Sequence, residues 1–312
     1  MIATLKNEES SVRSFLDALL AQTCHPQEII LVDGGSSDDT CRIIRNEYLS
    51  RNPNLILIEE LGNIAMGRNR AIREAHHDLI AVTDAGCRVS SNWLEKLAEP
   101  LLRGEPLDVC GGITLPVSQN LIQKAAGGYF TVPAEKEKTS LLLVSSRNIA
   151  FTRIIWERAG GYPEYLLLTG EDTLFNQKLL DAGARFLIIP EAVVNWPPPG
   201  TVEKIFLKAF HYSKGNAQGG FYQKTILKTA SAYLILLGFL AAGFWNSLLA
   251  AASLLGYGVL LFYSGLKLAA NQNDWSLVFP GALVKAIIDL GNLAGYLTGL
   301  LKPQTGKQAL KP

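Results

Sequence analysis

Apolar residues are distributed in two ways along the first 225 residues, as short continuous runs and as longer segments with helical spacing. The run Ile29–Val32 is typical of a strand buried on both faces, and it ends at Asp33. A short apolar segment, Ile2–Leu5, precedes it. Between the two, the apolar residues from Val12 to Leu20 recur at the period of an amphipathic helix. The pattern predicts a strand, a helix and a second strand.

Two more strands are predicted within the first hundred residues, at 55–60 and in the segment DLIAVTDAG. A helical pattern, GRNRAIREA, lies between them. Another, TCRIIRNEYL, follows the strand that ends at Asp33, with Asp38 or Asp39 as its N-terminal cap. Strands and helices that alternate in this way form βαβ units. The predicted fold class is therefore α/β, with a Rossmann-like, mainly parallel sheet and helices on both faces.

The pattern is looser between Gly111 and Phe151. LDVCGGITLPV predicts a strand that runs into a turn, SRNIAF predicts a short strand, and a helix begins at about Glu171. The segment RFLIIPEAVVNW predicts two short strands broken by Pro190, because proline cannot donate a hydrogen bond to a sheet. A proline-rich linker then leads into an amphipathic, lysine-bearing helix.

The composition changes after residue 225, where Leu, Ala, Gly, Phe and Tyr dominate and charged residues become few. Three apolar stretches follow, at 226–244, at about 248–266 and at 277–301. Each of the first two is long enough to span a hydrocarbon core about 30 Å thick. The third carries Lys285 and Asp289, so it is expected to pack inside a helical bundle or to lie at the membrane interface. A buried helical hairpin of a soluble protein is the alternative.

This change in composition predicts two domains, an α/β domain at 1–222 and a membrane-anchoring region at 223–312. Lysines flank the apolar stretches on both sides, which places both flanks in the cytosol and favours an even number of crossings. They are Lys204, Lys208, Lys214, Lys224 and Lys228 before the first stretch, and Lys302, Lys307 and Lys311 after the last. We expect a multi-pass protein of the cell (inner or plasma) membrane. Its α/β domain is expected in the cytosol, because no signal peptide is visible.

The charge argues against nucleic-acid binding, and the cysteine spacing argues against a zinc site or a CxxC motif. The net charge is +1 and no basic run with interleaved aromatic residues occurs, which argues against a nucleic-acid partner. The four cysteines show neither CxxC pairing nor zinc-ligand spacing with histidine. They are therefore expected to be reduced, structural thiols.

Acidic residues mark the ends of two predicted strands. Asp33 ends one strand and opens the loop DGGSSDDT, and Asp84 ends another. In open α/β sheets, ligands bind at the carboxyl ends of the strands. A carboxylate at Asp33 suits a neutral donor such as a base N–H or a ribose hydroxyl, although a turn and a helix cap explain part of this loop. Asp84 is placed to hold a divalent cation that neutralises a diphosphate.

Two further features could contribute to such a site. Arg68 and Arg70 lie shortly before Asp84 and could reach phosphate, while a solvated helix face is an equally good interpretation of both. Glu171 and Asp172 open a predicted helix, and acidic residues favour the first turn of a helix for electrostatic reasons alone. Either carboxylate could also serve as a general base toward an acceptor hydroxyl.

Six short segments follow one another along the chain: NEE in the first loop, VDGGSSDDT, TDAGC, SSRNIAF, AGGYPEY and GEDTLF. In this order they resemble the family 2 glycosyltransferases of the GT-A fold. The resemblance covers about residues 1–220, and the ordered set is much more specific than any single motif. The C-terminal apolar stretches resemble the membrane anchors of many bacterial members.

The resemblance implies a nucleotide-sugar donor and a single displacement that inverts the anomeric carbon. It implies that Asp172 is the catalytic base, with Glu171 beside it, and that an Asp-x-Asp motif at Asp84 holds the cation, Mg²⁺ or Mn²⁺. The residues implied in nucleotide-sugar binding are Asp33, Gly34, Ser36, Asp38, Arg68, Asp84 and Ala85. The expected acceptor is a lipid-linked or envelope glycan at the cytosolic membrane face, and membrane lipids are further partners.

Two departures from the family pattern change these expectations. The Asp-x-Asp motif reads Asp84-Ala85-Gly86, so its second carboxylate is missing and cation binding by Asp84 alone would be weaker. The Gln-x-x-Arg-Trp motif of processive members is absent, which favours transfer of a single sugar. The alternative function is a non-catalytic nucleotide-sugar-binding or scaffold membrane protein with a degenerate GT-A domain. A nucleotidyltransferase is disfavoured, because no Gly-rich, Arg- or Lys-bearing phosphate loop follows the first strand.

Overall fold

A computed structural model describes residues 1–131, 144–166, 170–219 and 247–301, and five single residues between the last two ranges. The chain divides into two compact units. The first comprises Met1–Pro116, Val132–Leu167 and Glu171–Pro197, and the second comprises Val117–Thr131, Leu168–Gly170 and Pro198–Pro312. The predicted domain boundary at residue 222 stays a prediction, because compactness alone does not test it.

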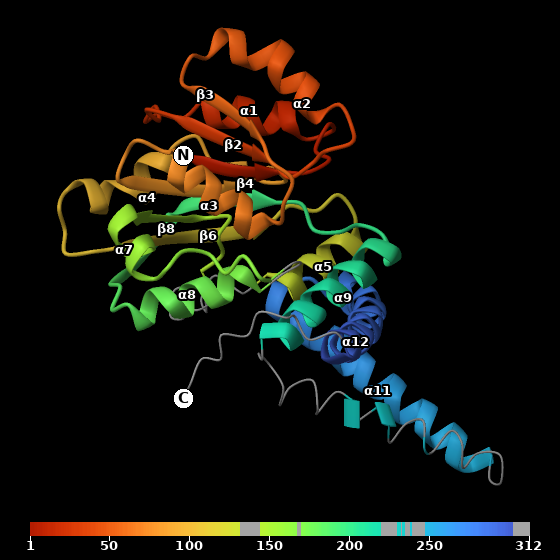
Figure 1. Cartoon of the computed structure of the whole chain (residues 1–312). Coiled ribbons are helices and arrows are strands. Elements are labelled where there is room, and N and C mark those ends of the chain that lie inside the picture. Colours follow the sequence, from red (N-terminus) through yellow and green to blue (C-terminus); the bar gives the residue numbers. More distant parts are fainter. Residues whose placement is uncertain are drawn as a thin grey trace. The chain divides into compact units, whose positions relative to one another are not determined.

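An eight-stranded sheet forms the centre of the first unit, in the order β3-β2-β1-β4-β7-β6-β8-β5 (Figure 1). Its strands are β1 (Ile2–Leu5), β2 (Ile29–Asp33), β3 (Leu55–Glu59), β4 (Leu79–Asp84), β5 (Arg88–Val89), β6 (Val109–Pro116), β7 (Ile149–Thr152) and β8 (Phe186–Trp196). Strands β1 to β4 are parallel, as are β6 and β8, whereas β7 runs antiparallel to β4 and β6, and β5 antiparallel to β8. The predicted α/β class with a mainly parallel sheet is confirmed.

Helices cover both faces of this sheet. They are α1 (Val12–Leu20), α2 (Thr40–Ile43), α3 (Ile64–Glu74), α4 (Trp93–Leu102), α7 (Arg153–Arg158) and α8 (Glu171–Asp181). Helices α3, α7 and α8 share one hydrophobic core with strand residues that include Val32 and Ile149. Successive residues of a strand point to opposite faces. Asn148, next to Ile149, accepts a hydrogen bond from Trp93 of α4 (2.7 Å), so α4 covers the second face.

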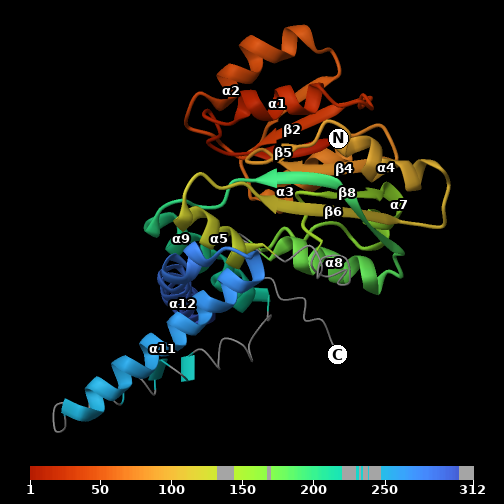
Figure 2. The ribbon, with the colours of Figure 1, turned by 180° about the vertical axis from the view of Figure 1, so that it is seen from behind.

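Strand β8 continues past Pro190, so the prediction of two short strands is wrong. Ile189 pairs with Gly112 and Val193 with Ile113, which leaves the three residues from Pro190 onward as a bulge opposite β6, the strand beside β8 in Figure 2. Proline is tolerated at such a bulge because its missing N–H has no ladder bond to make there. The proline therefore marks an irregularity within one strand.

The amide of Asn148 satisfies backbone groups at this bulge. The side chain is fully buried, and its Nδ2 donates to the carbonyl oxygens of Ile113 (3.0 Å) and Ala192 (2.9 Å). Its Oδ1 accepts the indole N–H of Trp93 (2.7 Å). A Cβ at Gly112 would lie 2.2 Å from the Ala192 oxygen, so a larger residue does not fit beside this network.

Replacing Asn148 with alanine is expected to destabilise the first unit by about 3 kcal/mol or more, since two carbonyl groups and one indole N–H lose a buried partner. Thermal unfolding of the full chain in detergent, followed by circular dichroism, would record a lower Tm. Asn54→Ala is the matched control, because Asn54 is exposed. Equal Tm values for the two variants would contradict the structural role of the Asn148 amide.

The second unit is built of helices. They are α5 (Leu121–Phe130), α9 (Val202–Gly219), α11 (Ser247–Gln272), the short η4 (Trp275–Leu277) and α12 (Val278–Leu301). Each contributes to one hydrophobic core, with Ala126, Ala209, Leu268, Leu277 and Val284 as examples. Lys124 of α5 and Asp274, which precedes η4, form an ion pair at 2.5 Å. The helices of this unit are therefore joined by apolar packing and by at least one charged contact.

Three glycines spaced four residues apart let α12 approach α9 closely. A Cβ at each would meet a backbone oxygen of α9, at 2.7 Å for Gly291, 2.1 Å for Gly295 and 2.7 Å for Gly299. Residues at this spacing lie on one face of a helix. Small residues on such a face bring two helix backbones together, as they do between helices inside membranes.

The variant Gly295→Ala is expected to destabilise the second unit by about 1–3 kcal/mol, because its methyl group would collide with the Phe210 carbonyl oxygen. Thermal unfolding of the detergent-solubilised chain would show this as a lower Tm. Gly258→Ala in α11 is the control, since a Cβ there meets nothing within 4 Å. It should be neutral or slightly stabilising, because alanine favours helices. The same Tm for both variants would argue against close packing of α12 on α9.

Among the described residues, two helices could span a membrane, judged by their length and composition alone. They are Ala250–Gln272 and Trp275–Leu301. They cover the second and third predicted stretches. Most of the first stretch, 226–244, lies outside the described residues. Lys285 and Asp289 form an ion pair with each other, and the third stretch packs against its helical neighbours, which is one of the two expected arrangements. The number of crossings stays a prediction.

Candidate active site

Strands β1, β2 and β4 end at the same edge of the sheet, because they are parallel neighbours. Asp33 is in register with Leu5 of β1, and Asp84 is in register with Thr4 from the other side of β1. Adjacent strands lie about 4.8 Å apart, so roughly 10 Å separates the two aspartates across the intervening strand. The loops that follow these three strands therefore start from one short section of the sheet edge.

The carboxylate of Asp33 organises the loop that follows it. The side chain is buried, and its Oδ2 accepts the backbone N–H groups of Gly35 (3.0 Å) and Ser36 (2.8 Å). Its Oδ1 accepts the hydroxyl of Ser36 (2.5 Å). Gly35 has a φ of 91°, a left-handed conformation that glycine adopts without strain. The Cys41 thiol also hydrogen-bonds to this carboxylate, and burial together with the Asp33 charge raises the pKa of the thiol to about 11.

Hydrogen bonds tie the loop after β2 to the loop after β1. Ser36 Oγ accepts the backbone N–H of Asn7 (2.8 Å), and Asp38 Oδ2 accepts that of Glu9 (3.1 Å). Asp38 Oδ1 accepts the N–H of Thr40 (3.1 Å), the first residue of α2, while Asp39 occupies the N-terminal cap position of this helix. Burial alone would raise the pKa of Asp38, but hydrogen bonds from Thr40 and Glu9 outweigh it and hold the pKa below its usual range. Asp38 thus remains ionised as part of the loop.

Arg68 of α3 connects two of the predicted site residues. Its side chain is 2% exposed, and Nη2 donates to Asp84 Oδ1 (2.7 Å) while Nη1 donates to Glu171 Oε1 (2.9 Å). The guanidinium carbon lies 5.3 Å from the ring centre of Tyr162, within cation–π range. The interpretation of Arg68 as part of a solvated helix face is therefore wrong. The same interpretation is correct for Arg70, whose side chain is partly exposed and pairs with glutamates on the surface.

Glu171 and Asp172 open helix α8 in different surroundings. Burial, together with repulsion from Asp172, raises the pKa of Glu171 to about 7 against the opposing effect of Arg68. Asp172 is partly exposed, and its Oδ1 accepts the backbone N–H of Thr173 (2.8 Å). The N-terminal end of a helix favours negative charge. Glu171 is thus held against Arg68, while Asp172 keeps access to solvent.

The structure brings together part of the predicted residue set. Arg68, Asp84 and Glu171 are in direct contact, Asp172 follows Glu171, and Ala85 is buried directly after Asp84. The loop of Asp33, Gly34, Ser36 and Asp38 begins on the other side of β1. The functional roles of these residues stay predictions, since contacts alone do not test them.

Asp84 fits a cation that a substrate helps to hold. The described residues include no group of three or more His, Cys, Asp or Glu side chains that could hold a metal ion without help from a substrate. One oxygen of Asp84 also accepts a hydrogen bond from Arg68. Magnesium is commonly bound by one or two carboxylates together with substrate phosphates. The chemistry of Asp84 therefore suits a cation shared with a diphosphate.

Sequence patterns missed the role of Asn69, which follows Arg68 on α3. Its Oδ1 accepts the indole N–H of Trp156 (3.0 Å) and the backbone N–H of Tyr162 (2.9 Å), and its Nδ2 donates to the Tyr162 carbonyl oxygen (2.9 Å). These bonds fix the AGGYPEY segment on α3 and hold the Tyr162 ring beside the guanidinium of Arg68. The AGGYPEY motif was a signal that this segment is constrained, but its partner is distant in sequence.

About the first half of the chain matches a family model, with residues 1–153 aligned to the model described as Glycosyl transferase family 2. Among curated relatives, the glycosyltransferase AglE of Haloferax volcanii is 29% identical over 257 residues, which cover 77% of this chain and 80% of that protein. The O-antigen chain rhamnosyltransferase WbaN of Salmonella anatum is 26% identical over 206 residues, which cover 61% of this chain and 64% of that protein.

Solved structures have a similar fold over most of the chain. The mannosyltransferase PcManGT from Pyrobaculum calidifontis, in complex with GDP-Man and Mn²⁺, has a TM-score of 0.59 at 23% identity and covers 94% of this chain and 86% of its own. TarS 1–349 of S. aureus has a TM-score of 0.51 at 18% identity and covers 96% of this chain and 89% of its own. At these identities the likenesses show the fold, and they cover nearly the whole chain.

Proposed function

The chain is a glycosyltransferase of family 2 with the GT-A fold, and on this basis we propose that it transfers a single sugar from a nucleotide-sugar donor with inversion at the anomeric carbon. Residues 1–222 are the catalytic domain, and residues 223–312 anchor it in the cell membrane from the cytosolic side. The acceptor is a lipid-linked or envelope glycan. Two candidate spans support the anchor, and the similarity to an O-antigen chain rhamnosyltransferase supports an envelope acceptor.

The donor binds along the loops after β2 and β4. The Asp33 carboxylate accepts an N–H of the base or a ribose hydroxyl, and Gly34, Ser36 and Asp38 shape this loop. The diphosphate lies at the end of β4. A divalent cation, Mg²⁺ or Mn²⁺, would neutralise its charge there and would be held by Asp84. The Mn²⁺ complex of the similar mannosyltransferase supports this cofactor.

Asp172 acts on the acceptor. Its carboxylate accepts the proton of the acceptor hydroxyl, and the acceptor oxygen forms a bond to the anomeric carbon of the donor sugar. The bond between this carbon and the diphosphate oxygen breaks, and its electron pair leaves with the nucleoside diphosphate. The partial exposure of Asp172 supports this role, because a base must meet its substrate.

The contact of Arg68 with both Asp84 and Glu171 is the observation that carries the proposal. It joins the carboxylate assigned to the donor to the acidic pair assigned to the acceptor. In a single displacement the base and the leaving group act on one carbon atom at the same time. A rigid, buried link between the two sides therefore suits this reaction better than two separate binding loops do.

Incubation of the purified full chain with UDP- and GDP-sugars and with membrane-lipid glycan extracts tests the proposal. Mass spectrometry should detect a nucleoside diphosphate and a glycan one sugar heavier, both dependent on donor and acceptor. The alternative is a non-catalytic scaffold, which the missing carboxylate at Gly86 favours. Calorimetry separates the two, since a scaffold binds the nucleotide-sugar without acceptor-dependent cleavage.

A further inference from the structure

The Asp-x-Asp motif lacks its second carboxylate in this chain, and the position of that missing carboxylate lies next to another acidic residue. Gly86 stands where the motif has its second aspartate. If Gly86 carried a Cβ, Oε1 of Glu8 would lie 3.7 Å from it, the one heavy atom of the described residues within 4 Å apart from its chain neighbours. In an aspartate, the carboxyl carbon is bonded to Cβ and the two oxygens lie one bond further out. The Glu8 carboxylate is therefore close to the place that the absent carboxylate would take.

The loop after β1 holds Glu8 in this position. Its backbone N–H donates to Thr40 Oγ1 (2.7 Å), and its carbonyl oxygen accepts the N–H groups of Ser11 (3.0 Å) and Val12 (2.8 Å). Its side-chain Oε2 accepts the hydroxyl of Ser11. These bonds account for the backbone and for Oε2. The other carboxylate oxygen, Oε1, is the one that lies near Gly86.

Strand pairing also brings Glu8 toward Asp84. Strand β1 lies beside β4, so the loop with Glu8 begins next to the strand that Asp84 ends. Gly86 follows Asp84 by two residues, and Glu8 Oε1 lies near Gly86. Two carboxylates in such a position can hold a divalent cation together with substrate phosphates.

We infer that Glu8 replaces the second carboxylate of the motif and, with Asp84, holds the divalent cation on the donor diphosphate. The inference rests on the proposed function. It explains how a chain that lacks one acidic residue of its motif retains two carboxylate ligands, the number that commonly suffices when substrate phosphates complete the coordination. The second ligand comes from the NEE segment at the end of β1 instead of the loop after β4.

Titration of the detergent-solubilised full chain with Mn²⁺ tests this role, with free Mn²⁺ followed by electron paramagnetic resonance, alone and with UDP or GDP. Glu8→Gln keeps the shape of the side chain and an oxygen for Ser11, but removes the charge. It should weaken Mn²⁺ binding at least as much as loss of a residue that orients a metal ligand does, about 10–100-fold, with little change in Tm. The double variant Glu8→Gln with Gly86→Asp should recover most of the affinity, because it restores a carboxylate at the motif position.

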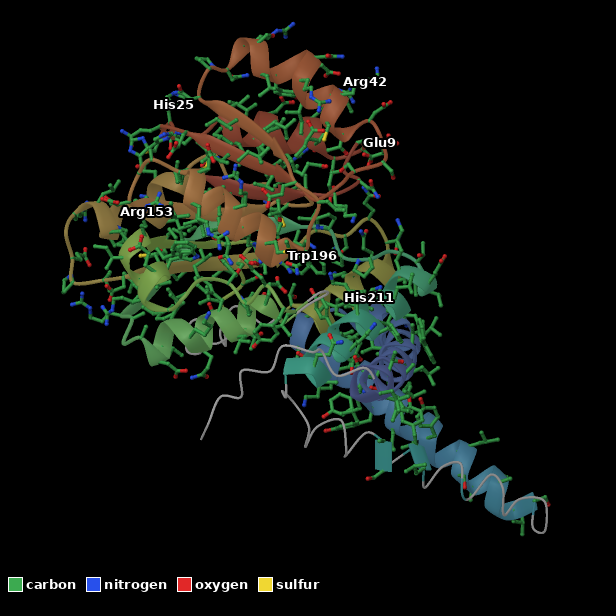
Figure 3. All side chains as sticks on the ribbon, viewed as in Figure 1. Glu9, His25, Arg42, Arg153, Trp196 and His211 are labelled. Carbon is green, nitrogen blue, oxygen red and sulfur yellow. The ribbon has the colours of Figure 1, made fainter. Side chains whose placement is uncertain are left out.

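Glu9→Gln is the matched control. Glu9 is the next residue, and it is exposed on the outer side of the same loop near Arg42 in Figure 3. It should bind Mn²⁺ like the unaltered protein. If Glu8→Gln fails to fold, Glu8→Asp takes its place, since a carboxylate shortened by one carbon should weaken binding to a smaller extent.

Three results would overturn the inference. One is unchanged Mn²⁺ affinity in Glu8→Gln or, where that variant does not fold, in Glu8→Asp. Another is a loss that Gly86→Asp does not reverse in the folded double variant. The third is an unaltered protein that transfers sugar without binding Mn²⁺, which rejects the cation role and leaves the proposed function in place. Absence of any acceptor-dependent transfer, in contrast, rejects the proposed function whatever the Mn²⁺ titration shows.

Discussion

Replacing Asp172 with asparagine is expected to lower turnover by about 10²–10⁴-fold, the usual contribution of a positioned general base. The amide keeps the size of the side chain and an oxygen for the hydrogen bond from Thr173, but it cannot take the acceptor proton. Donor affinity and Tm should stay close to those of the unaltered chain, because Asp172 is partly exposed. Acceptor-dependent release of nucleoside diphosphate at saturating substrate measures turnover, and calorimetry measures donor binding.

Asp181→Asn is the matched control for this experiment. Asp181 is the last residue of the same helix and is exposed, so its neutralisation should leave turnover unchanged. Full activity in Asp172→Asn would show that the base is assigned to the wrong residue. If Glu171→Gln were then inactive while folded, Glu171 would be the base, and its contact with Arg68 would have to open during the reaction.

The sheet and the positions of its acidic residues were predictable because they depend on local patterns. An apolar run that ends in an aspartate specifies both a buried strand and a carboxylate at its end, as with Asp33 and Asp84. The left-handed conformation of Gly35 was not predicted, although glycine is the residue that adopts it without strain.

Features that depend on distant partners were not predictable in the same way. Pro190 indicates a break when only its neighbours are considered, whereas the strand continues because Asn148, far earlier in the chain, satisfies the backbone at the bulge. Arg68 is equally consistent with an exposed helix face until Asp84 and Glu171 are placed beside it. The proximity of Glu8 to Gly86 belongs to the same class, because strand pairing creates it.

Replacing Arg68 with methionine is expected to destabilise the first unit by about 3–5 kcal/mol, the usual result of removing one partner from a buried charged cluster. Methionine fills much of the volume of arginine but leaves the carboxylates of Asp84 and Glu171 without their shared donor. Thermal unfolding in detergent measures the loss, and turnover should fall with it. Arg70→Met is the control, since Arg70 lies on the same helix, half-exposed, in surface ion pairs worth little.

Combining Arg68→Met with Glu171→Gln separates the structural part of this effect from the catalytic part. The double variant removes the guanidinium and one carboxylate that depends on it, so it should regain part of the Tm lost in Arg68→Met. Its turnover should stay low, because the guanidinium that joins Asp84 to the helix start carrying Glu171 and Asp172 is absent from this variant too. Arg68→Lys should also be impaired, since an ammonium group lacks the planar fork that binds two carboxylates at 2.7 and 2.9 Å. Recovery of turnover together with Tm in the double variant would contradict the positioning role and limit Arg68 to stabilising the fold.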